Sequence, residues 1–289
     1  MNKLTFFFFL FTALAYANDD VIEFHTPIGV KKLNLEQLQK QFVEREVSTY
    51  NLDTKRIETF LGFSMDNIIH SFWSDVKEAN NFVQIECHDG YIAYIEAKKF
   101  RTNRSYIAYK LKGNDNFVTI DGYQKKIVDL GRFYLVWKES YKKGADTRRR
   151  HHWPWSIKSI KIINELPDDI KPLKTASDDV NWGYLNFVKQ CLTCHKLNGF
   201  GGEVGPDLML SENWKKQDDK WLMQYISDPK SLNKDSKMSR FPKYIDIREV
   251  RIRNISLYLR HLTGLGEDKK EGRFLHSELE KILEQKVQK

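Results

Sequence analysis

The sequence is short of cysteine and of long apolar runs. Only three of its 289 residues are cysteines, and two of them share one motif, which excludes a fold held by several disulfides. Past the first residues, no apolar run approaches the ~20 residues that a membrane-spanning helix needs. The chain has no internal repeat, and 41% of its residues are hydrophobic. These features indicate folded domains, about two for a chain of this length.

The first residues have the pattern of an export signal. Lys3 precedes an apolar run from Leu4 to Leu14, and Ala15-Tyr16-Ala17 has the small-x-small form of a cleavage site. The alternative is an uncleaved membrane anchor, for which the run is too short. We therefore expect a signal peptide over residues 1–17, cleavage near Ala17 and a periplasmic mature protein.

The chain is basic, with a formal net charge of +8, and loss of Lys3 with the signal lowers this by one. A basic surface attracts acidic proteins or anionic membrane surfaces over a long range. Nucleic acid, the other usual partner of a basic protein, is disfavoured by export. We expect an acidic partner or a membrane-bound complex, and no spanning segment after cleavage.

The mature chain divides into two regions of different pattern. Residues 18–164 predict an α+β domain, residues 165–177 a proline-broken linker, and residues 178–265 a helical domain. The charged tail, 266–289, is either a docked helix or a solvated one. In the first region the pattern predicts a helix capped by Asn34, a second helix, and four strands: Leu35–Val43, Met65–Val76, Phe82–Glu86, Tyr91–Ile95, Phe133–Trp137 and Ile157–Ile163.

The sharpest motif is Cys191-Leu192-Thr193-Cys194-His195. Two thiols three residues apart can bond to the two vinyl groups of a haem, and the adjoining imidazole can reach its iron from the same side. This spacing predicts one covalent haem c, attached at Cys191 and Cys194 with His195 as the proximal iron ligand. Zinc binding and thiol redox chemistry are the alternatives for such a cysteine pair.

The surroundings of the motif resemble a class I cytochrome c. Gly183 and Phe187 stand where that family's first helix has a glycine and an aromatic residue, and Tyr258 stands at the crossing point of a last helix, Ile247–Leu262. A glycine-rich loop ends in Gly205-Pro206-Asp207-Leu208. The resemblance implies an all-α domain in which the Pro206 carbonyl accepts a hydrogen bond from His195.

The resemblance also implies a sixth, distal iron ligand, and three methionines are candidates. Met223 lies in a helical segment and Met209 lies close to the Gly-Pro turn, whereas Met238 lies in a polar loop before the last helix. We therefore expect Met238 to be the ligand, although Ser239 follows it where the family usually has proline. A His/Met-ligated haem leaves no open position for substrate, which favours electron transfer over enzymatic catalysis.

The first region resembles the molybdopterin oxidoreductases of the sulfite oxidase type. Four stretches occur in that family's order: Phe60–Ile69, Asp89-Gly90-Tyr91, Tyr106–Gly113 and Leu130–Trp137. In that family a molybdenum-binding cysteine precedes the first stretch, and here none does. The resemblance thus implies a related fold without molybdopterin.

Three features of the first region each have more than one interpretation. Cys87 is expected to be a buried, inert residue, with a redox role as the alternative. The cluster Arg148–His152 is expected to be a solvated basic loop, with an anion pocket or a docking patch as alternatives. Trp153 and Trp155 are expected to pack in a core or between domains rather than against a cofactor.

Three functional hypotheses follow. The leading one is a periplasmic monohaem cytochrome that carries single electrons and docks to its partner through the N-terminal domain. The second is a molybdenum-dependent oxidoreductase that passes electrons to its own haem domain. The third is a haem sensor or a peroxidase-like protein with a displaceable sixth ligand.

Overall fold

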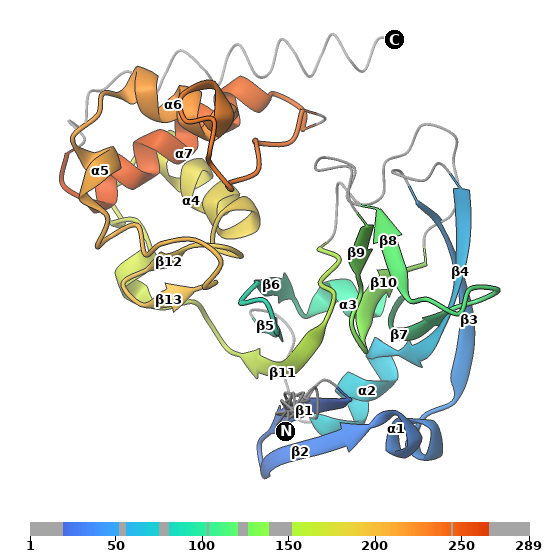
Figure 1. The fold of residues 1–289 in the computed structure, drawn as a ribbon. Helices are drawn as coiled ribbons and strands as arrows, with labels where there is room; N and C mark the ends of the chain where they lie inside the picture. The colour runs from blue at the N-terminus through green and yellow to red at the C-terminus, as the bar shows by residue number, and fades with distance from the viewer. Residues whose placement is uncertain are drawn as a thin grey trace, which may run out of the picture.

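The computed structural model describes residues 20–51, 56–74, 81–102, 104–120, 127–138, 152–243 and 245–265. Strands predominate as far as residue 163, and helices follow (Figure 1). Three predicted features lie outside the described residues: the signal peptide, the arginines and first histidine of the Arg148–His152 cluster, and the tail 266–289.

The first sheet has five strands in the order β2-β1-β11-β5-β6. β1, the first strand in the sequence, pairs in parallel with β11, the last, and the other strand pairs are antiparallel. β6 forms one edge of the sheet. The bounds are β1 Val21–Thr26, β2 Gly29–Asn34, β5 Phe82–Cys87, β6 Ile92–Glu96 and β11 Ile157–Ile163.

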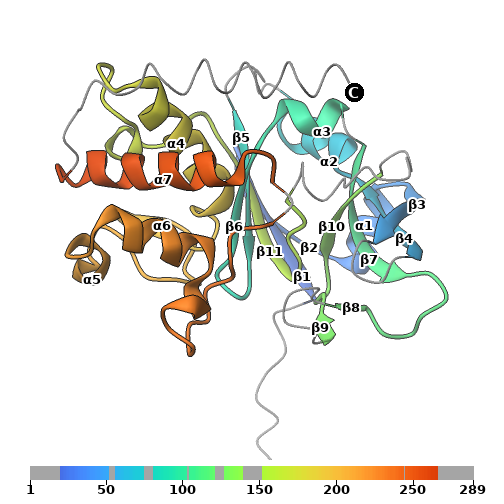
Figure 2. The ribbon, with the colours of Figure 1, turned by 90° about the horizontal axis from the view of Figure 1, so that it is seen from above.

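The second sheet has four antiparallel strands in the order β10-β7-β4-β3. Figure 2 shows it on the side of the first sheet that faces away from the C-terminal helices. A short ribbon of β8 and β9 accompanies it. The bounds are β3 Glu44–Asn51, β4 Arg56–Ser64, β7 Ser105–Leu111, β10 Tyr134–Trp137, β8 Val118–Ile120 and β9 Ile127–Asp129.

Short helices complete the N-terminal core. These are α1 Leu35–Gln41, α2 Met65–Phe72 and α3 Lys98–Thr102. Asn34 caps α1 as predicted, because its side chain accepts from the Gln37 amide while the Gln37 side chain accepts from the Asn34 amide. Apolar side chains of both sheets and of α2 form one buried cluster, which includes Phe24, Ile68 and Trp137. The helices and strands predicted for this region are confirmed, with ends that differ by a few residues.

The C-terminal part is built on two crossing helices, α4 Asp178–Gln190 and α7 Arg248–Leu262. They approach closely at Gly183, where an added Cβ would overlap the Asn254 carbonyl oxygen and lie 2.8 Å from Tyr258 Cβ. Tyr258 is fully buried and its ring centroid is 5.4 Å from that of Phe187. The helix crossing expected at Gly183 and Tyr258 is therefore observed.

Shorter elements lie between these two helices in the chain. α5 Glu212–Lys215 and α6 Asp219–Ser227 cover one side of α7, as Figures 1 and 2 show. One 3₁₀ turn, Asp168–Ile170, precedes α4 in the chain, and a second, Pro229–Ser231, follows α6. The Tyr258 hydroxyl donates to the Ile170 carbonyl at 2.5 Å, so the first 3₁₀ turn is fastened to α7.

The prediction that residues 178–265 form an all-α cytochrome c domain is wrong. Lys196–Leu197 (β12) and Phe200–Gly201 (β13) pair as an antiparallel hairpin, so the described chain is mixed α/β in both parts. Asn198 and Gly199 form the turn with φ of 51° and 80°. Asn-Gly is the preferred sequence for a two-residue hairpin turn because both positions need positive φ. The glycines of this loop were interpreted only as a family resemblance, although Asn198-Gly199 is also a hairpin signal.

No helix within the described ranges is both long and apolar enough to cross a membrane.

Candidate functional site

The predicted motif forms a tight turn at the end of α4, here called the cysteine turn, Cys191–His195. The Cys191 amide donates to Phe187 O, and the amides of Cys194 and His195 both donate to Cys191 O at 3.0 and 2.9 Å. Leu192 and Thr193 are buried, at 0% and 3% exposure. The turn continues the helical hydrogen bonds by one step, which places both cysteines and the histidine in one compact loop.

The imidazole of His195 is held by the glycine-rich loop. Its Nδ1 lies 3.0 Å from the Pro206 carbonyl oxygen, which is the contact that the resemblance implies. Because a carbonyl only accepts, Nδ1 donates, and the neutral ring keeps its lone pair on Nε2. A Cβ added at Gly205 would lie 2.5 Å from Cε1 and 2.7 Å from Nδ1 of this ring. Only glycine at position 205 leaves room for the imidazole in this orientation.

Burial sets the protonation states at this site. It lowers the pKa of His195, against the opposing effect of the Pro206 hydrogen bond, so the ring favours its neutral form. Burial also raises the pKa of Cys191 to about 12 and raises the pKa of Cys194. None of the three cysteines forms a disulfide. Protonated thiols are poor nucleophiles, which disfavours the alternative of disulfide exchange at this turn.

Met238 lies in the loop that precedes α7. It is half-buried, and its amide donates to Ser236 Oγ at 3.3 Å, which in turn lies 3.1 Å from Tyr225 Oη. The two rival methionines, Met209 and Met223, pack against the C-terminal core, and Met238 does not belong to that cluster. The proposed role of Met238 as an iron ligand stays a prediction.

The predicted cofactor, one covalent haem c, is contradicted. In the part of the chain that the structure describes, no group of three or more His, Cys, Asp or Glu side chains could hold a metal ion. A metal bound by protein side chains usually takes three or four of them, and His195 is not joined by such a set. We therefore withdraw the haem assignment.

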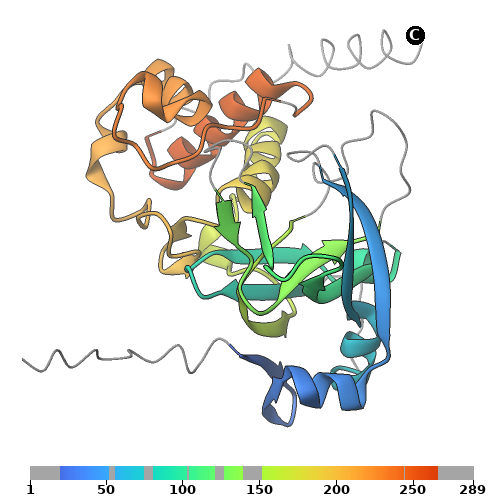
Figure 3. The same ribbon diagram turned by 45° about the vertical axis from the view of Figure 1, so that its right-hand side comes forward.

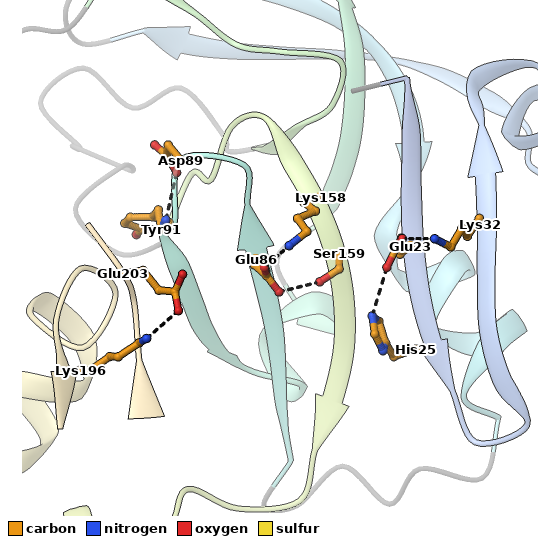
Figure 4. A network of polar contacts seen from close by, with 10 residues as sticks. All are labelled: Glu23, His25, Lys32, Glu86, Asp89, Tyr91, Lys158, Ser159, Lys196 and Glu203. Carbon is orange, nitrogen blue, oxygen red and sulfur yellow. Dashed lines mark hydrogen bonds and ion pairs between the residues drawn. The ribbon is translucent and has the colours of Figure 1, made fainter. Parts of the chain in front are cut away.

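The sequence analysis missed that the N-terminal domain meets the cysteine turn. The Ile92 amide at the edge strand β6 donates to Thr193 O at 2.9 Å, and the Glu203 amide donates to Gly90 O at 2.8 Å. Figure 4 shows the turn Asp89–Tyr91 beside the ion pair between Lys196 and Glu203, whose Nζ–Oε1 distance is 2.6 Å. The stretch Asp89-Gly90-Tyr91 was the available signal, but it had been read only as a family likeness.

Aromatic side chains extend this contact between the two parts. The rings of Tyr94 on β6 and Phe200 on β13 have centroids 5.0 Å apart. Tyr94 is buried within the same apolar cluster as Phe187 and Tyr258. Figure 3 shows the hairpin next to the edge of the first sheet. The two parts thus share one apolar cluster at the cysteine turn.

The remaining predicted residues lie in the N-terminal part. Cys87 is buried at 2% exposure, as predicted, and burial raises the pKa of its thiol far above the ordinary value. Trp153 and Trp155 pack against the apolar cluster around Tyr134, which confirms the prediction of a packing role. His152 is the described member of the basic cluster, and its ring lies against Tyr91.

Comparison with known proteins does not identify this chain. No protein-family model matches it, and no curated protein matches it significantly.

Proposed function

We propose that this protein is an exported carrier of single electrons, which works as c-type cytochromes do. In this proposal a redox group is attached through Cys191 and Cys194, and His195 faces it. The observation that carries the proposal is the His195 ring, which is locked by Pro206 and Gly205 directly after the two cysteines.

The protonation of the site supports this use. Nδ1 of His195 is occupied by the Pro206 carbonyl, so Nε2 is the nitrogen that can bind an electrophilic centre. A hydrogen bond that fixes the tautomer also raises the basicity of such a ligand.

The proposed setting is the periplasm, with an acidic protein or a membrane-bound respiratory complex as the electron-exchange partner. The basic composition supports this because unlike charges speed the encounter of two redox proteins. The N-terminal domain is proposed to dock to this partner rather than to catalyse a reaction.

Intact-mass measurement of the exported, denatured protein tests the proposal. We expect an adduct that survives denaturation, is absent from Cys191→Ala/Cys194→Ala, and is kept in the matched control Cys87→Ala. Reductive titration of the same sample should consume one electron per chain. Free thiols at both positions, with no redox transition, would contradict the proposal. One molybdenum atom per chain would favour the oxidoreductase hypothesis instead.

A further inference from the structure

The loop between α6 and α7 carries much of the positive charge of the chain. Within residues 229–243, here called the lysine loop, five residues are basic and one is acidic: Lys230, Lys234, Lys237, Arg240, Lys243 and Asp235. The resulting formal net charge of +4 is half of the +8 carried by all 289 residues. So many like charges in one short stretch produce a strong local positive potential.

Two buried residues hold the lysine loop against the neighbouring helices. Ser236 and Phe241 are 8% and 4% exposed. The Phe241 amide donates to Ile226 O at 3.2 Å, and Ser236 Oγ lies 3.1 Å from Tyr225 Oη, so both residues are tied to α6. From α7, the Arg248 guanidinium donates to Phe241 O. The loop is therefore anchored at two points, and its basic side chains are carried on a fixed stretch of backbone.

Four lysines of the loop are exposed and have no countercharge. Lys230, Lys234, Lys237 and Lys243 form no ion pair within the part of the chain that the structure describes. Lys196 of the hairpin, by contrast, lies 2.6 Å from a carboxylate oxygen. Unpaired like charges repel one another, and an anionic surface placed over the loop relieves that repulsion.

The kind of cation distinguishes between the two anionic surfaces that such a loop could meet. Protein interfaces are enriched in arginine and depleted in lysine, because the planar guanidinium fits a carboxylate in a fixed geometry. Four of the five cations here are lysines, whose hydrated point charges on flexible stems suit a diffuse layer of lipid phosphates. Leu232, which is 38% exposed, stands among them, and an apolar side chain beside cations suits the boundary between headgroups and acyl chains.

We propose that the lysine loop binds the surface of an anionic phospholipid membrane. In the bound state the four lysine ammonium groups lie at the lipid phosphates, and Leu232 enters the headgroup layer. The binding needs no redox group at the cysteine turn, so it stands or falls independently of the function proposed above. A carrier held in this way reaches a membrane-bound partner by diffusion over a surface.

Co-sedimentation of the purified mature protein with lipid vesicles tests the proposal. We expect binding to vesicles of phosphatidylglycerol and phosphatidylcholine in equal parts, little binding to vesicles of phosphatidylcholine alone, and release at high salt. One lysine at an anionic surface contributes about fivefold in affinity. The triple variant Lys230→Gln/Lys234→Gln/Lys237→Gln should therefore bind on the order of a hundredfold more weakly.

The matched control, Lys110→Gln/Lys138→Gln/Lys174→Gln, removes three exposed lysines outside the loop that also form no ion pair among the described residues. Both triple variants lose the same charge, and both should melt like the wild type. An equal loss of binding in the two would show that only the total charge matters, which would overturn the assignment to the loop. Absence of wild-type binding to the anionic vesicles would overturn the proposal outright. If the wild type then bound immobilised polyglutamate and the loop variant did not, the loop would be a docking surface for an acidic protein instead.

Discussion

Two groups of residues hold the cysteine turn in place, one close to it in the sequence and one far from it. On one side, His195 is held by Gly205 and Pro206, which lie within the same loop. On the other side, the Thr193 carbonyl is held by the Ile92 amide, which lies about a hundred residues earlier on a sheet edge. The Pro206 contact was expected from the family resemblance, whereas the distant side was not expected. Two pieces of chain with no shared sequence pattern can therefore build one site.

The largest loss of stability is expected when the main apolar contact on the distant side, between Tyr94 and Phe200, is removed. Tyr94→Ala deletes a ring that is 5% exposed and packs on Phe200, so we expect a loss of about 3 kcal/mol in the free energy of unfolding. Denaturant unfolding measures the loss, and hydrogen exchange at the Ile92 amide shows whether the interface opens. Tyr94→Phe, which keeps the ring, should cost under about 1 kcal/mol. An unchanged exchange rate in Tyr94→Ala would show that the two parts are held together elsewhere.

The second-largest loss of stability is expected from overpacking of the crossing between α4 and α7. Gly183→Ala places a methyl group against the Asn254 carbonyl, so α4 and α7 must separate at a cost of about 2–3 kcal/mol. Thermal or denaturant unfolding checks this. Trp182→Ala changes the neighbouring residue, which is half exposed, and should cost much less. A similar loss in both variants would mean that the crossing is not the sensitive point.

On the local side, Gly205→Ala should move the His195 ring away from Pro206. We expect about 1–2 kcal/mol of destabilisation, from overpacking and from weakening of one hydrogen bond. The NMR signal of the Nδ1 proton reports the bond directly. Val204→Ala, at an exposed neighbouring position, serves as the control and should leave that signal in place. A retained signal in Gly205→Ala would show that the ring has another way to fit.

The ion pair between Lys196 and Glu203 should contribute least to the stability of the protein. Lys196→Ala removes a contact whose carboxylate is largely exposed to solvent, where water and salt screen the attraction. We expect no resolvable change in melting temperature at physiological salt. A clear loss of stability would show that this pair, rather than the backbone hydrogen bonds beside it, fastens the hairpin to Gly90.

Local patterns predicted local structure well. The Asn34 cap and the strand Ile157–Ile163 follow from side-chain chemistry within a few residues, whereas the crossing at Gly183 was implied by the family resemblance. The hairpin at Asn198-Gly199 was equally local, and its omission made the fold class of the C-terminal part wrong. That error was one of interpretation, because the turn preference is visible in the sequence.

By itself the sequence determined the cysteine turn and the helix that precedes it, because hydrogen bonds and sterics over short stretches decide them. Only the tertiary structure decided that β6 forms an edge next to this turn and that the Ile92 amide reaches the Thr193 carbonyl. Such contacts depend on strand order and on how two apolar surfaces close over each other. Neither the strand order nor the packing of two apolar surfaces can be recognised from residues at a fixed spacing in the sequence.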